Sequence, residues 1–310
     1  MELLFMKPYC KEVLWGGTKL AEKFGYETEG DHTGEAWVVA ANKNGVSTVT
    51  EGEYAGKTLT ELWNEHRELF NNMQGEEFPL LVKLIDARDD LSIQVHPDDA
   101  YAKVNENCKG KTECWYIVDC DEGADIVTGH KAQTKEELKK LVEEKRWSEL
   151  LNIRPIKKGD FFFISSGTVH AIRKGTLILE IQQNSDITYR LYDYDRLQNG
   201  KPRELHTAKS LDVITCPQEL KDTREAEKIY RGQKSQVLVD CPLFTVTKHM
   251  VSGADEVVID NPYDFLIVNV LEGTGSVDGR KIKPGDSFIA PYGYRKLAFS
   301  GTLTFMTSHV

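Results

Sequence analysis

The sequence predicts a mainly β protein made of two related modules, each a β-barrel or β-sandwich, with a few short helices. Short runs rich in β-branched and aromatic residues follow one another and are separated by Gly, Asp, Asn and Pro. Helical periodicity is confined to a few windows. A motif that begins at Ile156 recurs at Ile282, which indicates that one β-module is present twice.

Most of the chain divides into short strand-like runs. They include EAWVVAA, PLLVKLIDA, LSIQV, CWYIVDC, DFFFIS, GTLILEIQQ, FTVTKHMV and DFLIVNVLEG. Their lengths and their turn-forming boundaries are typical of antiparallel sheets. The runs do not alternate with long helical segments, so the pattern favours a sandwich or barrel over a parallel sheet of βαβ units.

Three windows show helical periodicity. In residues 57–72, apolar residues recur at three- and four-residue steps, and Thr58 or Thr60 is the expected N-cap. Residues 134–152 begin with the Thr-x-x-Glu pattern of a capping box and continue with an apolar stripe. The third window, residues 206–214, has a weaker signal.

The repeat supports a division into two domains. IKKGDFFFISSGTVHAI and IKPGDSFIAPYGYRKLAF share Ile-Lys-x-Gly-Asp, an aromatic-rich strand and a glycine turn, and their alignment places His170 on Lys296. We expect a first domain at 1–225, with the helices near 57–72 and 134–152, and a second at 226–310. Since a lysine ammonium is not a metal ligand, the second copy would lack a metal site.

The polar segment 216–236 is the expected connection between the domains, because it is poor in core residues. The net charge of −10 argues against a nucleic-acid partner. No run of about 18 apolar residues is present, and the N-terminus lacks the pattern of a signal peptide, so we expect a cytoplasmic protein without a membrane segment. The six cysteines form no CxxC pair, which favours buried thiols over a zinc site.

Polar residues in LSIQVHPDD point to a metal site. By the two-residue period of a strand, Ser92, Gln94 and His96 share one face, and alternate residues lie close enough to reach one ion. Glu113 begins another strand, and the glycine turn of the first repeat presents His170. Two imidazole nitrogens and two oxygens suit zinc or another first-row divalent metal. The alternative is that these groups satisfy buried backbone groups or are structural histidines.

Four motifs, LSIQVHPDD, GKTECWYI, KKGDFFFISSGTVHAI and NSDITYRLYDYDR, resemble those of the class I mannose-6-phosphate isomerases, most closely the short bacterial form. The resemblance covers most of residues 1–215. It implies a catalytic cupin (jelly-roll) domain followed by a degenerate second one. In the family, one zinc ion per chain is bound by residues that match the four already selected, Gln94, His96, Glu113 and His170.

The resemblance also implies roles around the metal. The family's Lys-Pro-Glu is Lys111-Thr112-Glu113 here, with threonine in place of proline. Lys111 and Arg190 would stabilise an enediolate. Glu180 is the first candidate for the proton-transfer base, with His96 and zinc-bound water as alternatives.

Ser92 and Lys83 are the candidates for binding a phosphate. An unpaired ammonium inside LLVKLI would be costly, and a phosphate would relieve that cost. Alternatively, Lys83 pairs with a carboxylate or extends to the surface, and Arg190 forms a structural ion pair with Asp193 or Asp195. We interpret Trp15-Gly16-Gly17 and Glu35-Ala36-Trp37 mainly as packing and turn positions.

The function implied is a zinc-dependent isomerase that interconverts mannose 6-phosphate and fructose 6-phosphate through a cis-enediol. The alternatives are a non-catalytic sugar-phosphate-binding cupin and a cupin metal-dependent oxygenase. We expect a small phosphosugar as the substrate, neither a nucleic acid nor a membrane as a partner, and a monomer or homodimer.

Overall fold

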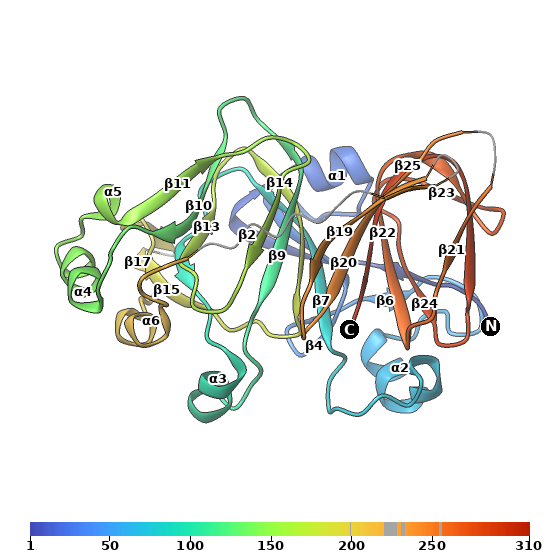
Figure 1. The fold of residues 1–310 in the computed structure, drawn as a ribbon, viewed down its shortest axis with the longest axis horizontal. Helices are drawn as coiled ribbons and strands as arrows, with labels where there is room; N and C mark the ends of the chain where they lie inside the picture. The colour runs from blue at the N-terminus through green and yellow to red at the C-terminus, as the bar shows by residue number, and fades with distance from the viewer. Residues whose placement is uncertain (199, 220–227, 231–232, 254–255) are drawn as a thin grey trace.

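The computed structural model describes residues 1–198, 200–219, 228–230, 233–253 and 256–310. Two β-modules lie side by side, and the short helices sit at their periphery (Figure 1). The predicted mainly β architecture is confirmed, and all the strand pairings of the main sheets are antiparallel, as expected for a sandwich or barrel. None of the described helices is long and apolar enough to cross a bilayer.

The first module consists of two antiparallel sheets. The five-stranded sheet has the order β11 (Leu151–Pro155), β10 (Asp125–His130), β13 (His170–Ile172), β8 (Ile93–Val95) and β15 (Tyr189–Tyr192). The six-stranded sheet has the order β12 (Phe161–Ile164), β9 (Glu113–Cys120), β14 (Thr176–Gln183), β7 (Leu80–Ala87), β2 (Tyr9–Gly17) and β3 (Thr33–Val39). Strands β7 and β14 are buried along their whole length, so this sheet is covered on both faces.

The second module is one ten-stranded sheet. Its main path is β18 (Lys228–Tyr230), β19 (Gln233–Asp240), β20 (Thr245–Val251), β25 (Lys296–His309), β22 (Phe265–Val277), β24 (Ser287–Pro291), β1 (Leu4–Lys7) and β6 (Thr48–Val49). Strand β21 (Val257–Asp260) pairs with β25, and β23 (Arg280–Ile282) pairs with β22. Four short strands form two separate two-stranded sheets. One pairs β4 (Ala41–Asn42) with β5 (Gly45–Val46), and the other pairs β16 (Leu197–Gln198) with β17 (Lys201–Pro202).

The N-terminus of the chain contributes to the second module. Leu4 lies opposite Ile289 in the β1–β24 pairing, and β6 adds to the other side of β1. The predicted boundary at residues 225 and 226 lies outside the described residues. The last part of the predicted connection contains two paired antiparallel strands, β18 and β19.

The helices follow the predicted windows. The first window contains α2 (Leu59–Glu65) and the 3-10 turn η1 (Arg67–Phe70), and Thr58 caps α2 through a full capping box with Glu61. The second contains α4 (Lys135–Glu143) and α5 (Trp147–Leu150), and the third contains α6 (Thr207–Val213). Two further helices, α1 (Lys19–Phe24) and α3 (Asp99–Asn105), were not predicted.

The internal repeat has the same turn in both modules. Asp160 accepts a hydrogen bond from the Lys157 backbone N–H, and Asp286 accepts one from the Lys283 N–H, each at 2.9 Å. The glycine before each aspartate has φ of 91°, a left-handed conformation that favours glycine. After each turn comes a strand, the half-buried β12 or the buried β24, so the shared Gly-Asp motif sets the entry into equivalent strands.

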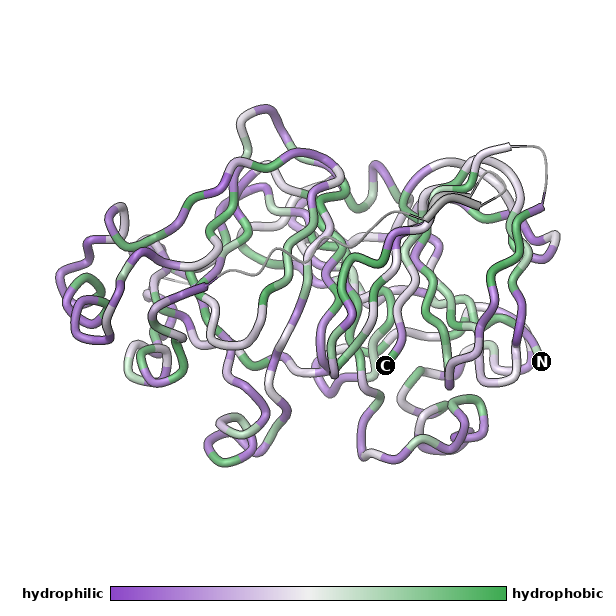
Figure 2. The backbone as a smooth tube through the Cα atoms, viewed as in Figure 1, coloured by the Kyte–Doolittle hydropathy of each residue, from purple (hydrophilic) through white to green (hydrophobic). Residues whose placement is uncertain are grey.

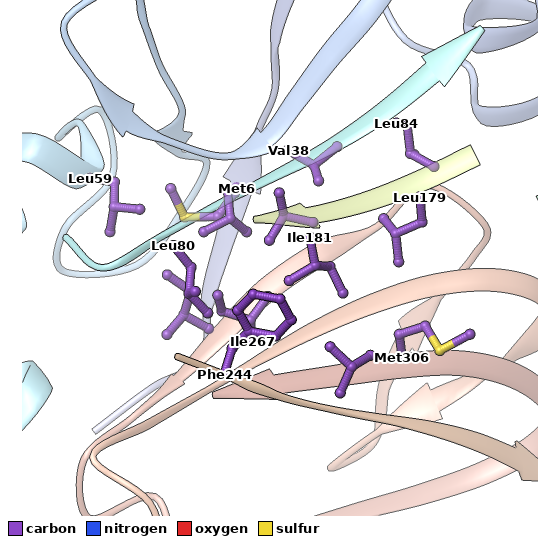
Figure 3. Close-up of a cluster of buried hydrophobic side chains, with 14 of the residues drawn as sticks. Met6, Val38, Leu59, Leu80, Leu84, Leu179, Ile181, Phe244, Ile267 and Met306 are labelled. Atoms are coloured by element: carbon purple, nitrogen blue, oxygen red, sulfur yellow. The ribbon is translucent and has the colours of Figure 1, made fainter. Parts of the chain in front are cut away.

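The largest hydrophobic cluster lies between the modules. It combines residues of the six-stranded sheet, such as Val38, Leu84 and Ile181, with Ile267 and Met306 of the second module (Figure 3). Figure 2 shows hydrophobic stretches along strands of both modules, whereas the outlying loops are mostly hydrophilic. The apolar surface that this packing buries is the main favourable contribution to holding the modules together.

Candidate metal centre and active site

Three of the four predicted ligands form one buried cluster. His96 follows β8, His170 begins β13, and Glu113 begins β9 on the facing sheet. Among the described residues this is the one group of three His, Cys, Asp or Glu side chains whose ligand atoms all come within 4.8 Å of one another. The cluster therefore joins the two sheets of the first module, and all three side chains are fully buried.

The distances within the cluster match those of atoms around one ion. The Nε2 atoms of His96 and His170 are 3.1 Å apart, and the Glu113 oxygens lie 3.4 and 3.5 Å from them. Nitrogen ligands about 2.0–2.1 Å from a zinc-sized ion are separated by about 3.0 Å at right angles and about 3.4 Å in a tetrahedron. The donor set thus fits a divalent metal without rearrangement of the backbone.

A hydrogen bond fixes the tautomer of His170. Its Nδ1 lies 2.8 Å from the Thr168 carbonyl oxygen, which can only accept, so Nδ1 carries the proton. The Nε2 lone pair is then free to face the cluster. Ligating histidines commonly donate their other ring N–H to a carbonyl in this way. Oε1 of Glu113 is buried and accepts no hydrogen bond from the described residues, which also favours a missing cation.

Gln94 completes the predicted set. It lies on β8 directly opposite His170, and its Nε2 atom is 3.3 Å from His170 Nε2. A half-turn of the amide would place Oε1 at that position, which is the atom that can bind a cation. The side chain is only partly buried, so this ligand lies nearest to solvent.

Electrostatics keep these groups in their metal-binding protonation states. Burial and the Lys111 ammonium lower the pKa of His96 to about 3, and burial also lowers the pKa of His170. Burial opposes ionisation of Glu113, but its pKa is held well below the usual value, chiefly by the Lys111 ammonium 2.9 Å from Oε2. Neutral imidazoles and an ionised carboxylate are the forms that bind a metal.

Threonine replaces the family's proline at position 112 and uses its N–H. The Thr112 backbone N–H donates to Gln183 Oε1 at 2.9 Å, and Gln183 in turn donates to Asp99 of α3. Proline has no N–H to donate. The segment that carries Lys111 and Glu113 is therefore held by a side-chain bond from the end of β14.

Glu180 and Lys83 belong to a row of residues across the six-stranded sheet. Trp115, Glu180, Lys83 and Trp37 lie opposite one another on β9, β14, β7 and β3. Trp115 Nε1 donates to Glu180 Oε2 at 3.0 Å, and the Lys83 ammonium lies 3.4 Å from Glu180 Oε1. Burial and the charge of Glu113 raise the pKa of Glu180, although Lys111 and Lys83 oppose this.

Lys83 has carboxylate partners within the protein. Its ammonium also lies 3.7 Å from Oε2 of Glu35, which in turn accepts a hydrogen bond from Trp37 Nε1. Burial would lower the pKa of Lys83, but the charges of Glu35 and Glu180 raise it. The structure therefore shows the alternative in which Lys83 pairs with a carboxylate, and the assignment of Lys83 to phosphate stays a prediction. The interpretation of Glu35-Ala36-Trp37 as packing missed this charge network.

The remaining predicted residues flank the cluster. Ser92 is buried immediately before β8. Arg190 lies on β15 opposite Gln94, and its Nη1 donates to the Glu204 carbonyl oxygen at 2.9 Å. Within the described residues, neither of the two alternative ion pairs of Arg190 forms: Asp193 pairs with Arg196 and Arg203, and Asp195 pairs with Lys145. Burial and Arg203 lower the pKa of Arg190.

Comparison with known proteins decides the family. Residues 3–124 match the phosphomannose isomerase type I catalytic domain, and residues 234–310 match the mannose-6-phosphate isomerase cupin domain. The mannose-6-phosphate isomerase ManA of Bacillus subtilis is 48% identical, across 100% of this chain and 99% of that protein. The chain belongs to the type I mannose-6-phosphate isomerase family.

Other relatives of the mannose-6-phosphate isomerase family agree. The Streptococcus mutans enzyme is 45% identical over 99% of this chain and 98% of its own length. The crystal structure of the Bacillus subtilis mannose 6-phosphate isomerase superposes with a TM-score of 0.97 at 45% identity, covering all of both chains. A putative mannosephosphate isomerase of Archaeoglobus fulgidus, at 22% identity and a TM-score of 0.76, shares the fold. The cupin architecture expected from the motifs is confirmed.

Proposed function

We propose that this protein is a zinc-dependent aldose–ketose isomerase that interconverts mannose 6-phosphate and fructose 6-phosphate. The observation that carries the proposal is the His96–Glu113–His170 cluster, a preformed metal site inside a chain of this family. Gln94 would be the fourth ligand, and one ion would be bound per chain. A set of two nitrogens and two oxygens without thiolate is typical of a catalytic site with an exchangeable position.

A bound zinc ion would supply Lewis acidity toward the sugar oxygens. The chain's own residues supply the proton transfer and the remaining positive charge. Glu180 is our candidate base, because burial and the charge of Glu113 raise its pKa, the direction that favours a carboxylate as a proton acceptor. His96 is less suited to that task, since its Nε2 faces the other ligands.

We assign two cations to the stabilisation of the negative enediolate. Lys111 contacts both His96 and Glu113, and Arg190 stands on the strand beside Gln94. Lys111 is buried, and a buried cation acts strongly on developing charge because little water screens it. We propose that Ser92 and Lys83 bind the phosphate. Lys83 would do so while it also pairs with its two carboxylate partners. Six free cysteines support a reducing compartment, and we propose the cytoplasm.

The test is a coupled assay that measures the fructose 6-phosphate formed from mannose 6-phosphate. It is combined with metal analysis of the purified protein. We expect zinc at one equivalent per chain and activity that a chelator removes and zinc restores. His170→Ala should lose both zinc and activity, whereas His309→Ala, in the second module, should keep both. Zinc without turnover would favour a sugar-phosphate-binding protein, and iron with oxygen uptake would favour an oxygenase; either result refutes the proposal.

A further inference from the structure

Arg190 is held from the side of its strand that faces away from the sheet. Strand β15 ends the five-stranded sheet, so one edge of it has no strand partner. The Arg190 backbone N–H donates to His206 Nδ1 at 3.2 Å, and the His206 N–H donates to the Arg190 carbonyl oxygen at 2.7 Å. His206 therefore takes the place of a neighbouring strand for this one residue, which satisfies both exposed backbone groups.

This pairing decides where the Arg190 side chain stands. Because its backbone groups point toward His206, Arg190 and Gln94 form a non-hydrogen-bonded pair across β15 and β8. In such pairs the Cα atoms are only about 4.5 Å apart and the side chains are closest. A register shift follows directly after Arg190, an irregularity that often re-aims a side chain beside an active site. The Arg190 side chain thus leaves its strand beside a predicted metal ligand.

The segment before His206 also holds the guanidinium. Nη1 donates to the Glu204 carbonyl oxygen at 2.9 Å, while Nε is buried and has no hydrogen-bond partner among the described residues. The Nη1 end of the guanidinium is therefore fixed, whereas the Nε donor remains without a partner among the described residues. A buried donor without a partner is costly, and a substrate oxygen would satisfy it.

The His206 side chain bonds to Arg190 and does not cap the helix that begins after it. His206 is the N-cap of α6, but its side chain accepts no hydrogen bond from the helix, and Ser, Thr, Asp or Asn is preferred at that position. Since Nδ1 accepts from the Arg190 N–H, the imidazole is neutral and carries its proton on Nε2. A residue that violates a local preference beside an active site indicates a functional constraint.

The segment is itself anchored at both ends. Before it, Arg203 binds Asp193 through Nε and Nη2. After it, α6 packs beside β15 (Figure 1), and Lys209 of that helix pairs with Glu106, which also accepts a hydrogen bond from Tyr189. The contacts on Arg190 therefore come from a fixed element.

We infer that His206 is a positioning residue for Arg190: its imidazole and backbone N–H hold the β15 edge so that the guanidinium faces the substrate beside Gln94. The inference rests on the proposed function and adds a residue that does not itself contact the substrate. Small displacements of a group that acts on the transition state cost about 10- to 100-fold in rate, with less effect on ground-state binding.

Two substitutions separate positioning from folding. His206→Ser supplies a better N-cap, so α6 should be as stable or more stable, but its short side chain does not reach the Arg190 N–H. We expect kcat for mannose 6-phosphate to fall about 10-fold with KM changed less than about 2-fold. His206→Asn also caps the helix, and its Oδ1 can take the place of Nδ1, so kcat should return to within about 3-fold of wild type.

A double-mutant cycle tests whether the effect passes through Arg190. In an Arg190→Lys background, His206→Ser should lower kcat by less than about 2-fold further. Unchanged kcat in His206→Ser, or equal losses in both backgrounds, would overturn the inference. Hydrogen exchange of the Arg190 amide, faster in the serine variant and restored in the asparagine variant, reports the bond without turnover. If the wild type shows no turnover, the proposed function is overturned, and unchanged exchange would overturn the positioning separately.

Discussion

Replacement of Lys83 by methionine tests whether this buried ammonium is primarily structural. The change keeps the length of the side chain and removes its charge. The ammonium lies 3.4 Å from Glu180 and 3.7 Å from Glu35, and the side chains of these three residues are 5%, 4% and 13% exposed. Removing one partner of a buried ion pair costs about 3–5 kcal/mol, because the other charge is left uncompensated.

The lower end of that range applies here. Glu180 already has a raised pKa, so it can take up a proton when its partner is lost, and this limits the cost. We therefore expect Lys83→Met to lower the free energy of unfolding by about 3 kcal/mol, measured by urea denaturation of the zinc-loaded protein at pH 7.5. The isosteric Glu180→Gln leaves Lys83 with Glu35 and should cost less than about 1 kcal/mol.

The double variant Lys83→Met with Glu180→Gln provides the control. With one carboxylate neutral, the double variant should be at least about 1 kcal/mol more stable than Lys83→Met alone. A loss below about 1 kcal/mol in Lys83→Met, with a large rise in KM for mannose 6-phosphate, would refute the structural argument and assign the ammonium to the phosphate.

Three further predictions concern single contacts. Thr58→Ala should lower the free energy of unfolding by about 1 kcal/mol through loss of the capping box, whereas Thr60→Ala should cost a few tenths at most. Thr112→Pro should cost about 1–3 kcal/mol, because Gln183 Oε1 loses its donor; an unchanged stability would contradict this. Burial lowers the pKa of His249 to about 4, so between about pH 6.5 and 4 the unfolded state binds more protons and stability falls as the pH falls. By pH 5 the wild type should lose about 2 kcal/mol more than His249→Asn in urea denaturation, and parallel pH profiles would contradict this.

Part of the candidate metal centre can be predicted from the sequence because its determinants are local. Gln94 and His96 share a face through the period of one strand, and the Gly-Asp turn that leads toward His170 is recognisable twice in the chain. The strand runs and the Thr58 cap are equally local signals, since each depends on neighbours within a few residues.

What the sequence does not predict depends on contacts between distant segments. The partners of Lys83 come from β3 and β14, and no spacing rule brings them together. The bond between Arg190 and His206 arises because a loop returns to the edge of β15. The pairing of β1 with β24 joins residues nearly the whole chain apart, and a four-residue strand carries no information about its partner.

The β1–β24 pairing has a consequence for the order of events during synthesis. Strand β1 is synthesised long before its partner β24, so the sheet that contains both strands cannot close until the chain has been made as far as β24. Until then the apolar residues of β1 are exposed to solvent, which makes the nascent chain a candidate for chaperone binding. A cut near residue 225 would not release two self-sufficient halves, since each would carry an unpaired strand edge that favours association with other chains.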